Sequence, residues 1–347
     1  MSSQPIKLGI IGCGKQAPKH ISGLRRCPGV EIVVADLRPE LAKSLADREE
    51  IAWVSSPDEL FADPGIEGID ICTPTTSHIS LAERSVESGK DFFCEKPLCT
   101  RSSDSLRLQK LVVQHQRIGM VGYVYRFCPM FELGKSLFSD ATNPCDSLVL
   151  GRTLTAWFRL GGRGSHQVWK HKKSAGGGAL NEMLVHMIDL AHWYFGPADS
   201  VEVVCKKLLL SDRKIQDTMF HVDAEDYVVV RMTMKCGVEV LCQADLVTPA
   251  FTQVVEIQGE NGTFMGSIQQ EFSSFLYLAE ARAGYQSGRT DLRLGRKNLF
   301  EAQMAEFVQA IRTRRQPSRC TVADSVMLLE TMEKLSTCHD ATLQPDV

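Results

Sequence analysis

Short apolar runs alternate with amphipathic stretches through the first third of the chain. The apolar runs are residues 7–11, 31–35, 68–72, 91–94 and 118–124. The stretches between and after them in which apolar residues recur every three or four positions are residues 18–24, 39–48, 57–62, 79–88 and 102–116. Strands that alternate with helices form parallel sheets covered by helices. The pattern predicts an α/β domain with a doubly wound parallel sheet over residues 1–125.

The second half of the chain has a different period. Apolar and polar residues alternate in residues 148–158, 201–209, 226–234, 238–244, 252–258 and 262–265. This alternation is typical of antiparallel strands with one buried face. It predicts an α+β domain over residues 126–347 with a large, open, mainly antiparallel sheet. The polar segment 280–296 reads as an exposed loop, and packing of the C-terminal helices on the first domain stays open.

One helical stretch of the second domain carries polar residues in register. After three glycines ending at Gly178, an apolar run is interrupted by Glu182, His186 and Asp189, spaced i, i+4 and i+7, and Trp193 continues the stripe. At about 100° per residue these side chains share one helix face. Burying each without a partner would cost about 1–3 kcal/mol. They form either a hydrogen-bonded core network or an active site, and two carboxylates with an imidazole favour the active site.

The turn after the first apolar run has the glycine pattern of dinucleotide sites. It reads Gly12-Cys13-Gly14-Lys15-Gln16-Ala17, or G-x-G-x-x-A, between a strand and a helix. The first glycine permits a tight turn, and the second lets a pyrophosphate approach the backbone at the helix start. The next strand ends at Asp36, where a carboxylate would bind the adenosine ribose. Asp36 favours NAD because it repels a 2′-phosphate, whereas Arg38 leaves NADP open.

Other reactive residues follow the later strands of the first domain. Thr73-Pro74, Glu95-Lys96 and Tyr125-Arg126 all come directly after apolar runs. Ligands of open α/β sheets bind beyond the carboxyl ends of the strands. Lys96 is therefore either a solvated surface lysine or an amine that points into the cofactor cleft.

The composition narrows the class of protein. The chain has 347 residues, of which 44% are hydrophobic and 23% charged, a formal net charge of −3 and a pI near 6.3. These values fit two globular domains and do not support a nucleic-acid or membrane partner. Without a signal sequence or a membrane span, we expect a cytoplasmic protein.

Metal and disulfide sites are not expected. The twelve cysteines and nine histidines include no Cys-x-x-Cys pair and no His-x-x-x-His spacing. We therefore expect reduced, mostly buried thiols and no metal site.

Taken in order, these motifs resemble the glucose-fructose oxidoreductase / inositol dehydrogenase / MocA family (Gfo/Idh/MocA) of NAD(P)-dependent sugar oxidoreductases. The resemblance is carried by Gly12-Cys13-Gly14 with His20, Thr73-Pro74 with His78, Glu95-Lys96-Pro97, Tyr125-Arg126-Phe127 with Pro129, Trp169-Lys170, and Gly176 to Leu180 with His186 and Asp189. It implies an N-terminal Rossmann domain and a sugar or cyclitol dehydrogenase. The chain departs from the family at Glu182, where aspartate is usual, and at Leu184, where glycine is usual, so the substrate stays open.

The resemblance also implies roles for individual residues. Lys96 and His186 flank the reacting carbinol as the catalytic pair, with Glu182 as third member. The substrate-binding residues are Lys96, Tyr123, Arg126, Glu182 and His186. Glycine pattern and resemblance together predict these cofactor-binding residues: Gly12, Cys13, Gly14, Lys15, Gln16, Asp36, Leu37, Arg38, Thr73, Pro74, His78, Glu95, Lys96, Arg126 and Trp169.

Further predictions concern other possible functions, the basic run 170–173 and the assembly of the chain. Some relatives use bound NAD to cleave a glycosidic bond through transient oxidation, and a non-catalytic, cofactor-binding regulator would use the same fold. The basic run 170–173 is either solvated surface or a contact to a phosphate or carboxylate of the substrate. We also expect a homodimer or homotetramer formed through the C-terminal sheet.

Overall fold

The computed structural model describes residues 5–138, 143, 145–163, 167–215, 217–295 and 297–337. The chain divides into two compact units: Met1–Phe127 with Lys297–Glu330, and Cys128–Arg296 with Thr331–Val347. The segment Lys297–Glu330 thus belongs to the first unit, which is the arrangement that the sequence left open. None of the helices in these ranges has the length and apolar character needed to cross a membrane.

The first unit contains a six-stranded parallel sheet in the order β3-β2-β1-β4-β5-β6. Its strands are β1 (Ile6–Ile11), β2 (Val30–Ala35), β3 (Ala52–Trp53), β4 (Ile66–Ile71), β5 (Asp91–Cys94) and β6 (Gly119–Val121). Its helices are α1 (Ala17–Leu24), α2 (Pro39–Glu49), α3 (Pro57–Ala62), α4 (Thr75–Glu87), α5 (Ser102–Gln114), α8 (Leu299–Thr313) and the first part of α9 (Val322–Thr337), with a 3-10 turn, η1 (Val124–Phe127). The predicted Rossmann sheet is confirmed.

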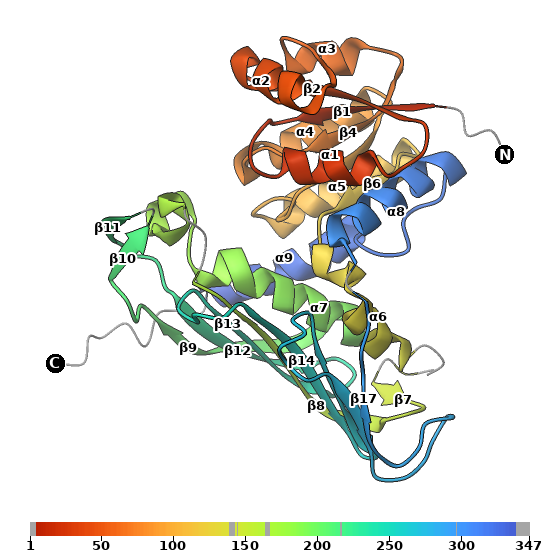
Figure 1. Cartoon of the computed structure of the whole chain (residues 1–347), viewed down its shortest axis with the longest axis vertical. Coiled ribbons are helices and arrows are strands. Elements are labelled where there is room, and N and C mark those ends of the chain that lie inside the picture. Colours follow the sequence, from red (N-terminus) through yellow and green to blue (C-terminus); the bar gives the residue numbers. More distant parts are fainter. Residues whose placement is uncertain are drawn as a thin grey trace. The chain divides into compact units, whose positions relative to one another are not determined.

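Helix α8 joins this unit from the far end of the sequence and packs against α1 (Figure 1). The contact is close because α1 contains a glycine: a Cβ on Gly23 would lie 2.8 Å from the carbonyl oxygen of Phe300. The Asn298 side chain caps α8 by accepting the backbone N–H groups of Phe300 and Glu301. His20 of α1 lies in the interior beneath this contact, where the Phe300 ring is 5.9 Å from its own.

The second unit contains a nine-stranded, mostly antiparallel sheet in the order β17-β16-β15-β14-β8-β13-β12-β9, with β7 paired to β8. Its strands are β7 (Asp146–Ser147), β8 (Gly151–Gly161), β9 (Ala198–Lys207), β12 (Tyr227–Met234), β13 (Glu239–Asp245), β14 (Thr252–Gly259), β15 (Gly262–Ser267), β16 (Phe275–Leu278) and β17 (Gly288–Asp291). The pairing of β8 with β13 is parallel. The predicted open, mainly antiparallel sheet is confirmed.

Two helices cover one face of this sheet. Helix α7 (Val185–Phe195) packs on β8 and β13, and α6 (Pro129–Ser136) packs on β15 (Figure 1). Aromatic rings fill the space below α7, with the Phe158 ring 5.6 Å from that of Tyr194. The side chains of β8 and β13 alternate between this core and the opposite face, as the period-two pattern predicts.

The strand boundaries differ from prediction where side chains bond to the backbone. The run predicted from residue 148 becomes a strand only at Gly151, because the Ser147 hydroxyl accepts the N–H groups of Val149 and Leu150 and holds a turn there.

The hairpin of β10 (Asp212–Ile215) and β11 (Thr218–His221) was not predicted.

The segment 280–296 is not a simple loop. It contains β17, which pairs with β16 as an edge strand, although residue 296 itself lies outside the described residues. Strand β17 reads Gly-Arg-Thr-Asp and has no apolar alternation, so the pattern that identifies the other strands is missing from it.

The prediction that all cysteines are reduced is wrong at one pair. Cys145 and Cys236 form a disulfide within the second unit, although 91 residues separate them. They meet because β7 and the turn after β12 lie at the same end of the sheet, which spacing along the chain does not reveal. Nine other cysteines are free thiols, and Cys338 lies outside the described residues.

Candidate functional site

The glycine turn between β1 and α1 has the backbone that a pyrophosphate site needs. Gly12 has a φ of +97°, and a Cβ there would lie 2.9 Å from the backbone of Cys72, so this position requires glycine. A Cβ on Gly14 would meet no atom within 4 Å, which leaves space beside the backbone. The Gln16 side-chain oxygen is buried at the helix start and has no hydrogen-bond partner in the described part of the chain. These residues fit a bound dinucleotide phosphate.

Asp36, at the end of β2, forms a hydrogen bond to this turn. Its carboxylate accepts the N–H of Cys13 at 2.8 Å and the N–H of Arg38 at 2.9 Å. The side chain therefore has a defined place beside the glycine turn, as the ribose-binding role requires. Leu37 is 90% exposed and Arg38 is also exposed, so both have free surface for an adenosine group.

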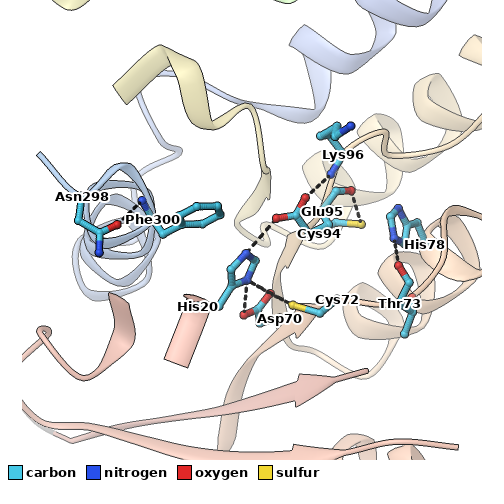
Figure 2. A network of polar contacts seen from close by, with 10 residues as sticks. All are labelled: His20, Asp70, Cys72, Thr73, His78, Cys94, Glu95, Lys96, Asn298 and Phe300. Carbon is cyan, nitrogen blue, oxygen red and sulfur yellow. Dashed lines mark hydrogen bonds and ion pairs between the residues drawn. The ribbon is translucent and has the colours of Figure 1, made fainter. Parts of the chain in front are cut away.

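The turn after β5 carries Glu95, Lys96 and Pro97, with a cis peptide bond between the last two. Glu95 is buried, and its carboxylate bonds to the His20 ring at 2.9 Å and to the backbone N–H of Lys96 at 3.2 Å (Figure 2). The carboxylate thus bonds within the protein, and the cofactor-binding role of Glu95 stays a prediction. Lys96 remains partly exposed at the surface of the turn.

His78 bonds to two backbone carbonyl groups, and its contact with cofactor stays a prediction. Its two ring nitrogens lie 2.7 Å from the carbonyl oxygens of Pro97 and Thr73, and its side chain is buried (Figure 2). The ring thus joins the turn after β4 to the turn after β5. Thr73 and Pro74, at the start of α4, remain partly exposed and are retained as candidates.

Tyr123 and Arg126 are buried in the first unit. Each side chain is only 1% exposed. The Tyr123 hydroxyl bonds to that of Ser325 at 2.7 Å, and the Arg126 guanidinium pairs with Asp324 at 3.0 Å. Both therefore bind the C-terminal segment of the first unit, and their roles toward substrate and cofactor stay predictions. The sequence missed this because the partners lie about 200 positions away.

In the second unit, the glycine-led stretch begins with one π-helical turn, Leu180–Leu184, before α7. Glu182 lies in this turn and His186 in the first turn of α7, and both side chains are partly exposed. Asp189 is buried, with 2% exposure, whereas Trp193 is partly exposed. The predicted stripe therefore includes three partly exposed residues, Glu182, His186 and Trp193, and one buried residue, Asp189, and its role in an active site stays a prediction.

Glu182 has a cationic neighbour that the sequence analysis did not identify. The Lys170 amine lies 2.5 Å from the Glu182 carboxylate and 5.3 Å from the centre of the Trp169 ring. Trp169 is 46% exposed. An accessible aromatic ring, an ammonium and a carboxylate thus form one polar surface in the second unit. The basic run 170–173 divides here, because the Lys172 amine donates instead to the backbone carbonyl of His221, and the backbone N–H of Lys173 donates to the Asp223 carboxylate.

The start of the glycine-led helix is capped by Glu225. Its carboxylate accepts the N–H of Leu180 at 3.2 Å, and its backbone carbonyl accepts the N–H of Ala179 at 2.9 Å. Burial raises the pKa of the Glu225 carboxyl, and backbone N–H groups and Lys206 oppose the shift only in part. A Cβ on Gly178 would lie 2.3 Å from this carboxylate, so the last glycine of the run makes room for the cap.

Among the residues that the structure describes, one group has donors near enough for a metal ion: His20, Asp70 and Cys72. The His20 ring is bonded directly to the Asp70 carboxylate at 2.9 Å, and both side chains are fully buried. The donors therefore bind one another. Asp70 is a functional candidate that sequence reasoning missed, although an acidic residue in the middle of a buried strand was a visible signal.

Lys96 belongs to the first unit, and Glu182 and His186 belong to the second. Within the first unit the structure brings the glycine turn, Asp36 and the two strand-end turns to one edge of the parallel sheet, as predicted from the topology. Within the second unit it brings Trp169 and Lys170 to Glu182.

Comparison with known proteins identifies relatives for both units. Residues 6–123 match a family model described as oxidoreductase family, NAD-binding Rossmann fold, and residues 145–265 match that of the GFO/IDH/MocA C-terminal domain. An inositol 2-dehydrogenase of Rhizobium meliloti is 25% identical over 269 residues, covering 77% of each chain. A levoglucosan dehydrogenase of Pseudarthrobacter phenanthrenivorans is 29% identical over 214 residues, covering 58% of this chain and 54% of that protein.

Solved structures share the fold. A levoglucosan dehydrogenase in complex with NADH and levoglucosan has a TM-score of 0.83 at 23% identity, covering 96% of this chain and 97% of that one. GenD2 from gentamicin A biosynthesis, in complex with NAD, has a TM-score of 0.80 at 21% identity, covering 97% and 95%.

Proposed function

The chain belongs to the Gfo/Idh/MocA family of oxidoreductases, with an NAD-binding Rossmann domain, and from that membership we propose that it transfers hydride between nicotinamide and a secondary alcohol of a sugar, cyclitol or sugar derivative. The observation that carries the substrate class is the surface formed by Trp169, Lys170 and Glu182. An exposed aromatic ring beside paired charges suits a ligand with apolar C–H faces and many hydroxyl groups. Relatives named inositol and levoglucosan dehydrogenases support the same class.

The first unit supplies the residues that would hold the cofactor. The candidates are Gly12, Cys13, Gly14, Lys15, Gln16, Asp36, Leu37, Arg38, Thr73, Pro74, His78, Glu95, Lys96 and Arg126, with Trp169 from the second unit. When bound, the nicotinamide accepts or donates the hydride. Asp36 favours NAD over NADP, because its carboxylate repels a 2′-phosphate.

The proton of the reacting hydroxyl requires a separate acceptor. We assign this role to His186, because an imidazole titrates near neutral pH and the side chain is accessible at the start of α7. The Lys96 ammonium would stabilise the developing alkoxide. The Glu182 carboxylate, which lies 2.5 Å from the Lys170 amine, is suited to accept hydrogen bonds from substrate hydroxyls.

The test is a panel of sugars and inositols assayed with NAD and with NADP. At least one polyol should be oxidised, and His186→Ala should abolish turnover while NADH binding persists. His221→Ala is the matched control, because this histidine is exposed on the β10–β11 hairpin and should be dispensable. Full activity of His186→Ala would overturn the assignment. Glycoside cleavage without net change in nicotinamide absorbance would favour the hydrolase alternative, and NADH binding without any turnover would favour the regulator.

We also propose that the open sheet face pairs with a second copy of the chain. Strand register places Glu256, Trp157, Leu241 and Arg231 side by side across four strands. Leu241 is exposed and Trp157 is half-buried, and the same face is hollowed beside them. An apolar pair flanked by opposite charges suits a self-complementary interface.

A further inference from the structure

His20 lies in α1, just after the glycine turn, with its ring between two carboxylates. Nδ1 is 2.9 Å from Asp70, and Nε2 is 2.9 Å from Glu95. A neutral imidazole has only one N–H donor, and ionised carboxylates only accept, so an imidazolium is needed to satisfy both contacts. Burial acts to lower the pKa of His20, but Asp70 and Cys72 together raise it well above its usual value.

The surroundings isolate this charge cluster from water. The Phe93 ring of β5 stands edge-on to the His20 ring at 5.3 Å, and Phe300 of α8 lies on another side. The Cys72 thiol is 3.3 Å from Nδ1, and burial raises the pKa of this thiol to about 12, so it stays neutral. Burial also raises the pKa of the Cys94 thiol well above its usual value.

The charges of the cluster do not balance without Lys96. Asp70 and Glu95 contribute two negative charges, and His20 contributes one positive charge. Burial opposes ionisation of Glu95, but the bond to His20 and the charges of His20 and Lys96 hold the pKa of this carboxyl below its usual value. Lys96 is therefore coupled to the Glu95 carboxylate by charge as well as by the backbone hydrogen bond.

A continuous set of bonds leads from His20 to the backbone of Lys96. One oxygen of Glu95 binds the His20 ring, and the other accepts the Lys96 N–H at 3.2 Å. Figure 2 shows Glu95 between the two residues. We propose that His20 is a positioning residue: as an imidazolium it fixes the Glu95 carboxylate, which in turn fixes the Lys96 turn. The inference rests on the proposed function only in the role of Lys96, which is to stabilise the developing alkoxide.

The arrangement links the two halves of the Rossmann site. Helix α1 starts at the glycine turn that would hold the phosphates, and His20 is on the inner face of that helix. The same residue holds the turn that carries the amine. A shift of about 1 Å in a reacting group can lower turnover about 100-fold, so a rigid link between phosphate turn and amine turn has catalytic value.

Two substitutions at His20 separate positioning from packing. In His20→Gln the amide falls near the position of Nε2 and keeps a donor for Glu95, whereas in His20→Asn it falls near Nδ1 and keeps only the Asp70 contact. Lys96 amide hydrogen exchange in the ¹⁵N-lysine-labelled full chain reports on the turn without any substrate. We expect His20→Asn to accelerate this exchange by about tenfold or more, as for one charge-assisted hydrogen bond lost, and His20→Gln to change it little.

Turnover provides the second measurement, with whichever polyol the panel identifies. The kcat of His20→Asn should fall by about 10- to 100-fold with KM and NADH affinity retained, and His20→Gln should restore most of it. Equal Lys96 exchange in two variants of equal urea stability would overturn the proposal. If neither variant folds, ¹⁵N shifts of the wild-type His20 ring decide: an imidazolium at pH 7 supports the proposal, and a neutral ring refutes it.

Discussion

The two glycines of the first turn should respond in opposite ways to an added methyl group. At Gly14 the new Cβ meets no atom within 4 Å, and the backbone is not in the left-handed region. Gly14→Ala should therefore change the free energy of unfolding by no more than about 0.5 kcal/mol. At Gly12 the φ of +97° and a Cβ 2.9 Å from the Cys72 backbone predict a loss of more than about 2 kcal/mol.

Cofactor binding should be sensitive to the added methyl group at Gly14, although folding stability is not. The space beside Gly14 is where a pyrophosphate would approach, so a methyl group there displaces it from the backbone N–H groups. Losing one charge-assisted hydrogen bond costs about 1.5–3 kcal/mol, which corresponds to a Kd for NADH raised about 10- to 150-fold. Fluorescence titration with NADH and urea denaturation of the same samples measure the two effects. Unchanged NADH affinity in Gly14→Ala, or unfolding as easy as in Gly12→Ala, would refute the reasoning.

Three further predictions concern the second unit. Lys170→Met should raise KM for the polyol by about tenfold, because Glu182 loses its cationic partner, while NADH affinity stays the same; an unchanged KM in steady-state kinetics would contradict this. Glu225→Gln should gain stability relative to wild type between pH 4 and pH 7, because a carboxyl whose folded pKa is raised loses stability as pH rises; urea denaturation at both pH values gives the sign. Leu241→Glu should dissociate the oligomer in sedimentation velocity, whereas the exposed Leu37→Glu in the first unit should leave it intact.

The fold could be predicted where burial repeats along the chain. Strands of the parallel sheet are buried on both faces and appear as apolar runs. Strands β12 and β13 are buried on one face, so apolar and polar residues alternate along them. Strand β17 is a polar edge strand whose formation depends on its partner β16, so no local pattern reveals it. The disulfide between Cys145 and Cys236 depends on long-range placement in the same way.

The residue types of the site could be predicted more readily than the contacts that those residues make. The glycine turn could be predicted because backbone geometry restricts the residue allowed at Gly12, and Asp36 was proposed because it ends the next strand. The contacts of Tyr123 and His78 could not be predicted, because a motif shows that a polar residue is needed without showing what it binds. Their partners are another turn and a distant helix, and both are determined by tertiary packing.

The difference in burial between Asp189 and Trp193 has a geometric cause. From His186, an advance of three residues in a regular α-helix turns by about 300°, which leaves an offset of about 60° from the starting face. An advance of seven residues leaves an offset of only about 20°, so Trp193 returns to the face of His186. On a helix buried on most sides the exposed strip is narrow, and 60° is enough to move a side chain from the surface into the core. Trp193 is partly exposed and Asp189 is buried, as this geometry requires. Sequence spacing therefore shows which residues lie near one helix face, but it does not show which of them are exposed when most of the helix is buried. The accessible residues of this helix are those whose side chains point closest to the direction of His186.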